Sequence, residues 1–395
     1  MVRTNIRAIS GEEMLEVLYQ LNSYAFHPSP PLQDKEEWLE RVRDRKGITC
    51  YALFEGDVPV ASVASTPMSQ QVRSKLFKIA GIWGVSTLPE ARRKGYSRRL
   101  LKRILEAARK DGRTFSCLYP FRESFYEHLG YTTFPQPFKA KFQPDVLSPL
   151  AKKDLGGTVK TVLIGDGYDQ YQQYLYKMQE HFHGMVVMDH DEAAWAKKTN
   201  RWWLALAEAQ GEVVGMMLYD LRGDHVTKFN LRVIRFAYEN SLGKYLLLKW
   251  IALHIDQASQ VEIWLAPFEQ PGTWMNDMRP ELEPVFFAPM GRVVDVSNIN
   301  LMRSGPGRFS VRLSDQLCPW NEGIWRLESS EGILHIRPTQ KPDCDLSIQG
   351  LAALIYGTQD PGDFVIRGWG NPSVQTQQVM RDMFPPAIPY LNEMF

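Results

Sequence analysis

Residues 79–105 read IAGIWGVSTLPEARRKGYSRRLLKRIL and predict a strand, a basic loop and a helix in direct succession. An apolar stripe at helical spacing indicates the helix, and it consists of Leu100, Leu101, Ile104, Leu105 and Ala108. Five basic residues lie between positions 92 and 99, although a helix N-terminus already carries partial positive charge. A strand, a glycine at position 95 and a helix N-terminus together form a backbone cradle for phosphate, so this stretch predicts an anion site.

The two common glycine-rich nucleotide motifs do not explain the stretch. It contains neither G-x-x-x-x-G-K-[ST] nor G-x-G-x-x-G, so it predicts neither a P-loop nor a dinucleotide fingerprint. A basic helix face that contacts only water remains an alternative interpretation, because many charge runs have no other role.

The spacing Arg92-x-x-Gly95-x-Ser97 after a strand resembles the acetyl-CoA pyrophosphate loop of the GNAT superfamily of N-acetyltransferases. Ser97 stands where the superfamily usually has glycine or alanine, and serine is also small and a good helix N-cap. The resemblance implies that the strands on either side of the helix splay apart and hold pantetheine between them. The residues that it implies for acetyl-CoA binding are Val85, Thr87, Arg92, Arg93, Lys94, Gly95, Tyr96, Ser97 and Pro120.

The same resemblance implies roles in the chemistry. Backbone groups of Val85 and Thr87 would pair with the pantetheine amides, and an N–H near Val85 would stabilise the developing oxyanion. The F-Y-x-x-L-G-Y pattern at residues 125–131 resembles the superfamily signature in which a tyrosine lies beside the cofactor sulfur. Tyr126 would then be the general acid, since a phenol of pKa about 10 can protonate a leaving thiolate. A core tyrosine in a short helix is the alternative.

Trp38 and Trp83 are candidates for the acceptor pocket, although aromatic residues of this kind more often pack in the core.

Bulk composition limits the class of protein. The chain has 395 residues, 44% of them hydrophobic, which is enough for two or three domains with real cores. A net charge of +1 favours neither nucleic acid nor a membrane surface as the main partner. The four cysteines lack C-x-x-C spacing and the eight histidines lack H-x-x-x-H or H-E-x-x-H spacing, so we expect no metal site. Without an apolar signal segment at the N-terminus, we expect a cytoplasmic protein.

The order of expected elements indicates an α/β (α+β) fold with three domains. Residues 1–150 form the first: a strand, two helices, a hairpin around Gly56, the stretch 79–105, a strand at 114–119 and a further strand region at 131–142. Residues 151–297 repeat this order as a degenerate GNAT-like domain. Its loop at 238–244 has a glutamate and no arginine, so we expect no cofactor there.

Residues 298–395 begin with short strands and continue with helices, and their D-L-x-I-x-x-L-A-x-L-x-x-G pattern at 345–357 resembles sterol-carrier-protein folds. Three domains in this order resemble the enhanced intracellular survival (Eis) family of acetyltransferases. That resemblance implies a homohexamer, and a C-terminal carboxylate, here that of Phe395, that enters the active site as general base. An apolar chain end supports docking, while a tail packed only for stability or for a subunit contact is the alternative.

The sequence therefore predicts an acetyl-CoA-dependent N-acetyltransferase. The implied acceptors are aminoglycosides, polyamines or lysine side chains, with Glu393 as a possible contact to their ammonium groups. A non-catalytic protein that binds lipid or another small molecule, or senses acetyl-CoA, is the alternative function.

Overall fold

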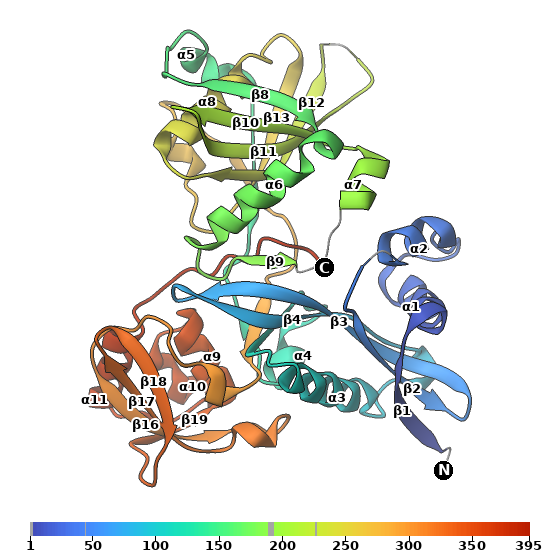
Figure 1. Cartoon of the computed structure of the whole chain (residues 1–395), viewed down its shortest axis with the longest axis vertical. Coiled ribbons are helices and arrows are strands. Elements are labelled where there is room, and N and C mark those ends of the chain that lie inside the picture. The colour runs from blue at the N-terminus through green and yellow to red at the C-terminus, as the bar shows by residue number, and fades with distance from the viewer. Residues whose placement is uncertain (1–2, 44, 189–192, 226) are drawn as a thin grey trace. The chain divides into compact units, whose positions relative to one another are not determined.

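The computed structural model describes residues 3–43, 45–188, 193–225 and 227–395. The chain forms two compact units (Figure 1), the first made of Met1–Pro135, Phe182–Asp191 and Ala288–Phe395, and the second of Gln136–His181 and Glu192–Phe287. These limits differ from the predicted domain boundaries at 150 and 297, because the chain crosses between the units four times.

The main sheet of the first unit has the strand order β1-β2-β3-β4-β5-β15-β6, with β9 paired to β3. Among the described strands of this sheet, only β4 and β5 pair in parallel, so the sheet is mixed. The strands are β1 Thr4–Ile9, β2 Thr49–Glu55, β3 Val58–Val72, β4 Lys75–Thr87, β5 Phe115–Leu118, β6 Thr132–Thr133, β9 Val186–Met188 and β15 Met290–Val293.

Helices cover both faces of this sheet. Side chains of β2 alternate between the faces: Ala52 and Phe54 pack in the cluster with α1 (Gly11–Phe26) and α2 (Lys35–Arg43), and Leu53 packs with α3 (Tyr96–Lys110). The predicted apolar stripe of α3 is buried throughout, which confirms the helix read from its spacing. A fourth, short helix, α4 (Glu123–Glu127), follows β5.

Strands β4 and β5 separate partway along their length. They pair at only three positions, and Gly81 opposite Cys117 is the last of these. Beyond it β4 continues to Thr87 and is paired only on its other edge, to β3. The register with β3 shifts there, and Gly84 in the shifted segment has φ +60°, a conformation that favours glycine.

Residues 298–384, called the C-terminal part below, form a second, four-stranded sheet of the first unit in the order β18-β17-β16-β19. Its elements are β16 Arg308–Ser314, β17 Gly323–Ser330, β18 Ile333–Pro338, β19 Cys344–Ser347, α9 Ile348–Tyr356, α10 Phe364–Arg367 and α11 Val374–Met383. This part shares one apolar core with β4 and β5. A buried ion pair from Arg292 of β15 to Asp315, 2.6 Å long, also joins it to the main sheet.

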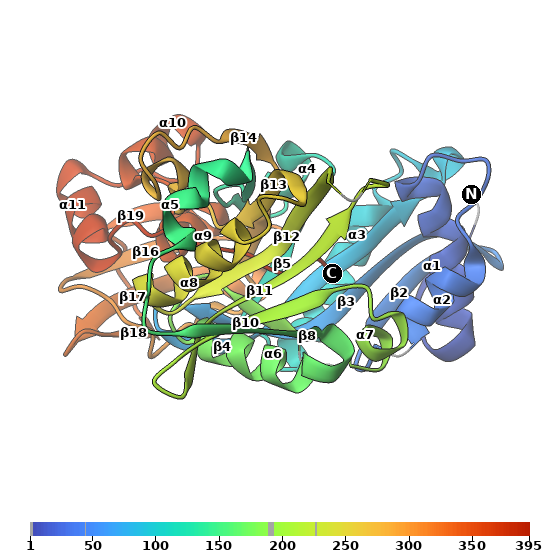
Figure 2. The same ribbon diagram turned by 90° about the horizontal axis from the view of Figure 1, so that it is seen from above.

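The second unit repeats the strand plan of the first, as the sequence predicts. Its sheet has the order β14-β7-β13-β12-β11-β10-β8, and the β12–β13 pairing is again parallel. Strands β8, β10, β11 and β12 lie side by side in Figure 2. The elements are β7 Phe138–Phe142, β8 Thr158–Leu163, β10 Trp203–Ala209, β11 Glu212–Arg222, β12 Phe229–Tyr238, β13 Ala258–Leu265, β14 Glu281–Pro284, α5 Ser148–Ala151, α6 Ile164–Gln179, α7 Ala193–Thr199 and α8 Ser241–Ala252.

Two strands, β7 and β15, pair in a different sheet from the one that their predicted domains imply. The strand region predicted at 131–142 is two strands, of which β6 stays in the first sheet and β7 pairs with β13 and β14 of the second. Conversely, β15 comes from the predicted second domain and pairs with β5 and β6. Strand pairing depends on partners distant in the chain, which local patterns do not reveal.

Candidate active site

A cavity of about 730 Å³ opens where α3 begins. Its lining includes seven of the nine residues predicted to bind acetyl-CoA: Val85, Thr87, Arg92, Arg93, Gly95, Tyr96 and Ser97. Of the other two, Lys94 turns to an ion pair with Glu55 and Pro120 is buried after β5. The predicted loop residues therefore converge on one site.

The N-terminus of α3 carries no side-chain cap. Gly95 is the N-cap residue, with φ +75°, and among the described residues no side-chain cap is found at this helix start. A Cβ at Gly95 would meet nothing within 4 Å, so glycine is needed for its backbone angle and not for space. Ser97 does not cap the helix; its hydroxyl lies 3.0 Å from Thr87 Oγ1. The orphan N–H groups remain available to an anion.

The five basic residues at this helix start have three different environments. Arg92, Arg93 and Arg98 line the cavity. Lys94 and the hydroxyl of Tyr96 instead bond to the Glu55 carboxylate at 2.9 and 2.5 Å, and these bonds lower the pKa of Glu55. Arg99 turns away to Thr4. Three cations therefore face the anion site, while a carboxylate holds the fourth outside it.

The free edge of β4 forms one wall of the same cavity. Val85, Ser86 and Thr87 line it in the segment where β4 no longer pairs with β5. Backbone N–H and C=O groups along such an edge can pair with an extended ligand as an added strand would. The cavity thus combines an anion cradle at one end with a strand edge along its side.

Tyr126 lies behind the opposite wall. Its side chain is 3% exposed, and its ring packs edge-on against Phe125, a lining residue, at 5.0 Å between centroids. Burial raises the pKa of Tyr126 well above its ordinary value, so the phenol is protonated at neutral pH.

The C-terminal tail, residues 385–395, docks on the main sheet of the first unit. The ring of Phe395 lies 5.9 Å from that of Tyr119, the residue after β5, and Tyr119 donates a hydrogen bond to the Leu391 carbonyl oxygen. A Cβ at Gly81 would come within 1.7 Å of Met68 Cε and 3.0 Å of the Phe395 ring, so the backbone there lies close to both side chains. The last residue of the chain therefore sits where β4 and β5 separate.

Side-chain and backbone bonds fix this tail. The Asn392 side-chain oxygen accepts from the Val186 N–H at 2.8 Å, and the Tyr390 N–H donates to the His183 carbonyl at 2.8 Å. Glu393 is 8% exposed, and its carboxylate accepts from the side-chain amide of Asn392 at 3.3 Å.

The two tryptophans predicted for the acceptor pocket have different surroundings. Trp38 is 8% exposed and packs edge-on against Tyr19 in the core of α1 and α2. Trp83 is half-buried, and its indole N–H donates to Thr66 Oγ1 at 2.9 Å. Neither lines the described cavity.

Sequence reasoning missed the wall that faces the basic loop. It consists of Ala25 and Phe26 at the end of α1 together with Phe121, Phe125, His128 and Leu129 around α4. Two of these aromatic side chains are strongly exposed, Phe121 by 60% and Phe26 by 49%. The position of Phe125 and His128 inside the F-Y-x-x-L-G-Y motif was the available signal.

Known proteins match the chain in two segments. Residues 5–134 match the family described as an acetyltransferase (GNAT) domain, and residues 299–392 match the sterol carrier protein domain family. No curated protein matches the sequence.

Solved structures match nearly the whole chain at low identity. A GCN5-related N-acetyltransferase from Anabaena variabilis has a TM-score of 0.83 at 18% identity, with 100% of both chains covered. One from Kribbella flavida has a TM-score of 0.81 at 22% identity and 99% coverage of both chains. Eis1 from Mycobacterium abscessus has a TM-score of 0.76 at 16% identity and 100% coverage of both. At these identities the likeness shows the fold.

GNAT domains use acetyl-CoA as acyl donor and act on an amine-bearing acceptor. Within the described residues, no helix is long and apolar enough to cross a membrane. The chain combines a GNAT acetyltransferase domain with a C-terminal sterol carrier protein domain, and it is an acyltransferase.

Proposed function

We propose that the protein transfers the acetyl group of acetyl-CoA to an amino group of a cationic small molecule, such as an aminoglycoside or polyamine, or of a lysine side chain. The observation that carries this proposal is the single cavity that joins the uncapped start of α3 to the free edge of β4. Arg92, Arg93 and Arg98 would hold the pyrophosphate, and the edge at Val85 and Thr87 would hold pantetheine.

The docked tail supports a direct transfer. The amine nitrogen attacks the thioester carbon, the C–N bond forms, and the C–S bond breaks. An α-carboxylate at Phe395 accepts the proton that the amine loses, and Tyr126 supplies a proton to the departing sulfur. The seat of the Phe395 ring at Gly81, where β4 and β5 separate, supports the first assignment, and the packing of Tyr126 directly against the lining residue Phe125 supports the second.

The proposed contacts to the acceptor amine follow from the charge and exposure of nearby side chains. Glu393 lies two residues from the proposed base, and its carboxylate would attract an ammonium group. Trp83, which is partly exposed, is the better of the two tryptophans for contact with the acceptor, since Trp38 is packed in the core.

A thiol-release assay across a panel of amines tests the function. We expect free thiol only when acetyl-CoA and a suitable amine are both present. The alternative, a non-catalytic protein that binds lipid or senses acetyl-CoA, predicts a thermal shift with acetyl-CoA and no amine-dependent thiol with any member of the panel.

Moving the terminal carboxylate tests the base. One glycine added after Phe395 keeps the ring but displaces the carboxylate, and we expect turnover to fall roughly 10²- to 10⁴-fold. Acetyl-CoA affinity should stay within about twofold, because the basic loop is untouched. Met394→Leu, a change at an exposed neighbour, is the matched control. Full turnover in the extended chain would remove Phe395 from the mechanism.

The cytoplasmic location remains a prediction from the N-terminal sequence, and the homohexamer remains a prediction of the Eis resemblance. Analytical ultracentrifugation of the purified chain measures the assembly directly.

A further inference from the structure

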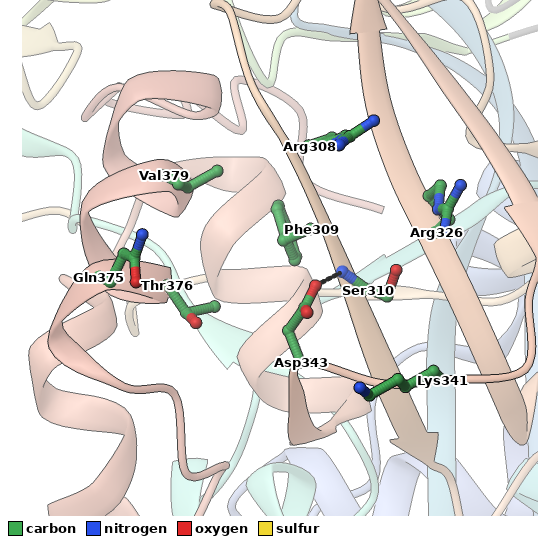
Figure 3. A pocket seen from close by; sticks show the side chains of 9 residues that line it. All are labelled: Arg308, Phe309, Ser310, Arg326, Lys341, Asp343, Gln375, Thr376 and Val379. Carbon is green, nitrogen blue, oxygen red and sulfur yellow. Dashed lines mark hydrogen bonds between the residues drawn. The ribbon is translucent and has the colours of Figure 1, made fainter.

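A second groove, of about 440 Å³, lies in the C-terminal part and shares no lining residue with the cavity at α3. Figure 3 shows it between the strands β16 and β17 on one side and α11 on the other. Three cations line it: Arg308 from β16, Arg326 from β17 and Lys341 from the segment before β19. Asp343 is its one acidic residue, so the lining carries a clear excess of positive charge.

The three cations lack counter-ions. Throughout the ranges that the structure describes, none of their side chains forms a hydrogen bond or ion pair with another residue. Other arginines of the same part are paired, namely Arg312 with Asp345 at 3.2 Å, Arg337 with Glu328 at 2.9 Å and Arg381 with Asp360 at 2.6 Å. The cations of the groove differ from these three arginines in this respect.

The one carboxylate in the groove is already in use. Asp343 Oδ2 accepts from the Ser310 N–H at 2.7 Å (Figure 3), and the Asp343 N–H donates back to the Ser310 carbonyl at 2.8 Å. Ser310 stands directly opposite Arg326 in the sheet, so Arg308, Ser310 and Arg326 project from the same face. Strand register thus holds two arginines on one face, beside a carboxylate whose role is to fix the loop.

The rest of the lining is uncharged. Gln375 and Thr376 come from the first turn of the ten-residue helix α11, whose N-terminus Ser373 caps by accepting from the Thr376 N–H at 3.2 Å. Val379, which is partly buried, adds an apolar side chain to the lining, whereas Phe309 is 3% exposed and packs in the core on the other face of β16.

We propose that this groove binds a small molecule through a phosphate or pyrophosphate group. Arg308 and Arg326 donate the charge-assisted hydrogen bonds, and Lys341 adds a point charge. The same chemistry fits a soluble phosphorylated compound and an anionic lipid headgroup.

Calorimetric titration of the full chain with inorganic pyrophosphate tests the site. The chain used carries Arg92→Ala and Arg93→Ala, which removes two of the three arginines that line the competing cavity at α3. We expect Arg326→Ala and Lys341→Ala each to weaken binding about tenfold, as loss of one charge-assisted contact does. Arg312→Ala is the matched control, since Arg312 lies on the same strand face but is paired outside the groove, and it should change binding less than twofold.

A second arm uses vesicles of phosphatidylcholine with or without phosphatidylglycerol and the same variants. Pyrophosphate binding that the groove variants lose assigns a soluble ligand, and vesicle binding that depends on phosphatidylglycerol and is lost in the same variants assigns a lipid headgroup. Failure to bind either probe, or equal binding by the parent chain and the Arg308→Ala/Arg326→Ala/Lys341→Ala variant, overturns the proposal. Unchanged thermal unfolding midpoints show that these surface variants are folded.

Discussion

Both units contain a strand, a loop and a helix in the same order, but the residues at the two helix starts differ. In the first unit β4 leads into α3 and pairs in parallel with β5. In the second unit β12 leads into α8 and pairs in parallel with β13. The first helix start faces a cavity lined by three arginines. The second is closed by the unit's own side chains.

Two sets of contacts close the start of α8 to an anion. Asn240 Oδ1 accepts from the Gly243 N–H at 3.0 Å, which satisfies a donor that α3 leaves open. Lys244 Nζ lies 5.4 Å from the Tyr238 ring centroid and 5.9 Å from that of Trp274, so its positive charge is held by aromatic faces. An anion site is therefore not a by-product of this fold. It requires a helix N-terminus without a side-chain cap and cationic side chains beside that N-terminus.

The largest expected effect comes from removing those cations. Arg92→Ala with Arg93→Ala should weaken acetyl-CoA binding roughly 10²- to 10⁴-fold, because two charged contacts of roughly 1.5–3 kcal/mol each are lost. Lys244→Ala, the counterpart in the second unit, and Lys102→Ala, an exposed lysine of α3, should change affinity by less than twofold. Calorimetric titration measures all three. A loss of affinity in Lys244→Ala would mean that the second unit also binds the cofactor.

Alanine substitutions at the two glycines near the helix starts should destabilise the protein for different reasons. A Cβ at Gly243 would lie 2.0 Å from the Val214 carbonyl oxygen, so Gly243→Ala should cost about 1–3 kcal/mol of unfolding free energy through overpacking. Gly95→Ala meets no atom within 4 Å, and its cost of about 1 kcal/mol comes from the positive φ alone. Urea unfolding compares them. Equal costs at both positions would contradict this difference.

Capping should be important only in the second unit. Asn240→Ala removes a side-chain cap and should lower the unfolding free energy by about 1 kcal/mol. Ser97→Ala removes only the contact with Thr87 and leaves the α3 start uncapped as before, so its effect should be about half as large or less. Thermal unfolding of the two variants, with Lys102→Ala as a surface control, provides the test.

The smallest effect is on pH dependence, where two hydrogen-bonded glutamates act in opposite directions. Bonds from Lys94 and Tyr96 lower the pKa of Glu55, so its stabilisation is present above the ordinary carboxyl pKa and is lost as the pH falls through the lowered value. Burial raises the pKa of Glu269, which accepts from Tyr238, so its contribution is lost as the pH rises through the raised value.

Glu→Gln variants separate these two contributions. Glu55→Gln should flatten the acid side of the curve of unfolding midpoint against pH, and Glu269→Gln should remove a decline above the ordinary carboxyl pKa. Parallel curves for both variants and the parent would show that neither group is linked to folding.

Much of the first unit could be predicted from local patterns. The strand–loop–helix order at 79–105 and the stripe on α3 depend on residues close in sequence, and the structure confirms both. The repeat in the second unit was also legible, because hairpins and amphipathic helices carry local signals. The roles of Lys94 and Ser97 could not be predicted from the sequence, because Lys94 forms an ion pair with Glu55 and the Ser97 hydroxyl contacts Thr87 Oγ1.

The sequence by itself determined that a basic, glycine-containing loop opens a helix and leaves its N–H groups for an anion. Only the tertiary structure decided that Ala25 and Phe26 form the facing wall, that β7 and β15 enter their respective sheets, and that Phe395 lies at Gly81. The physical reason is the range of the interactions. Helix periodicity and capping act within a few residues, whereas strand partners and the seat of a chain end are selected by packing between segments distant in the chain.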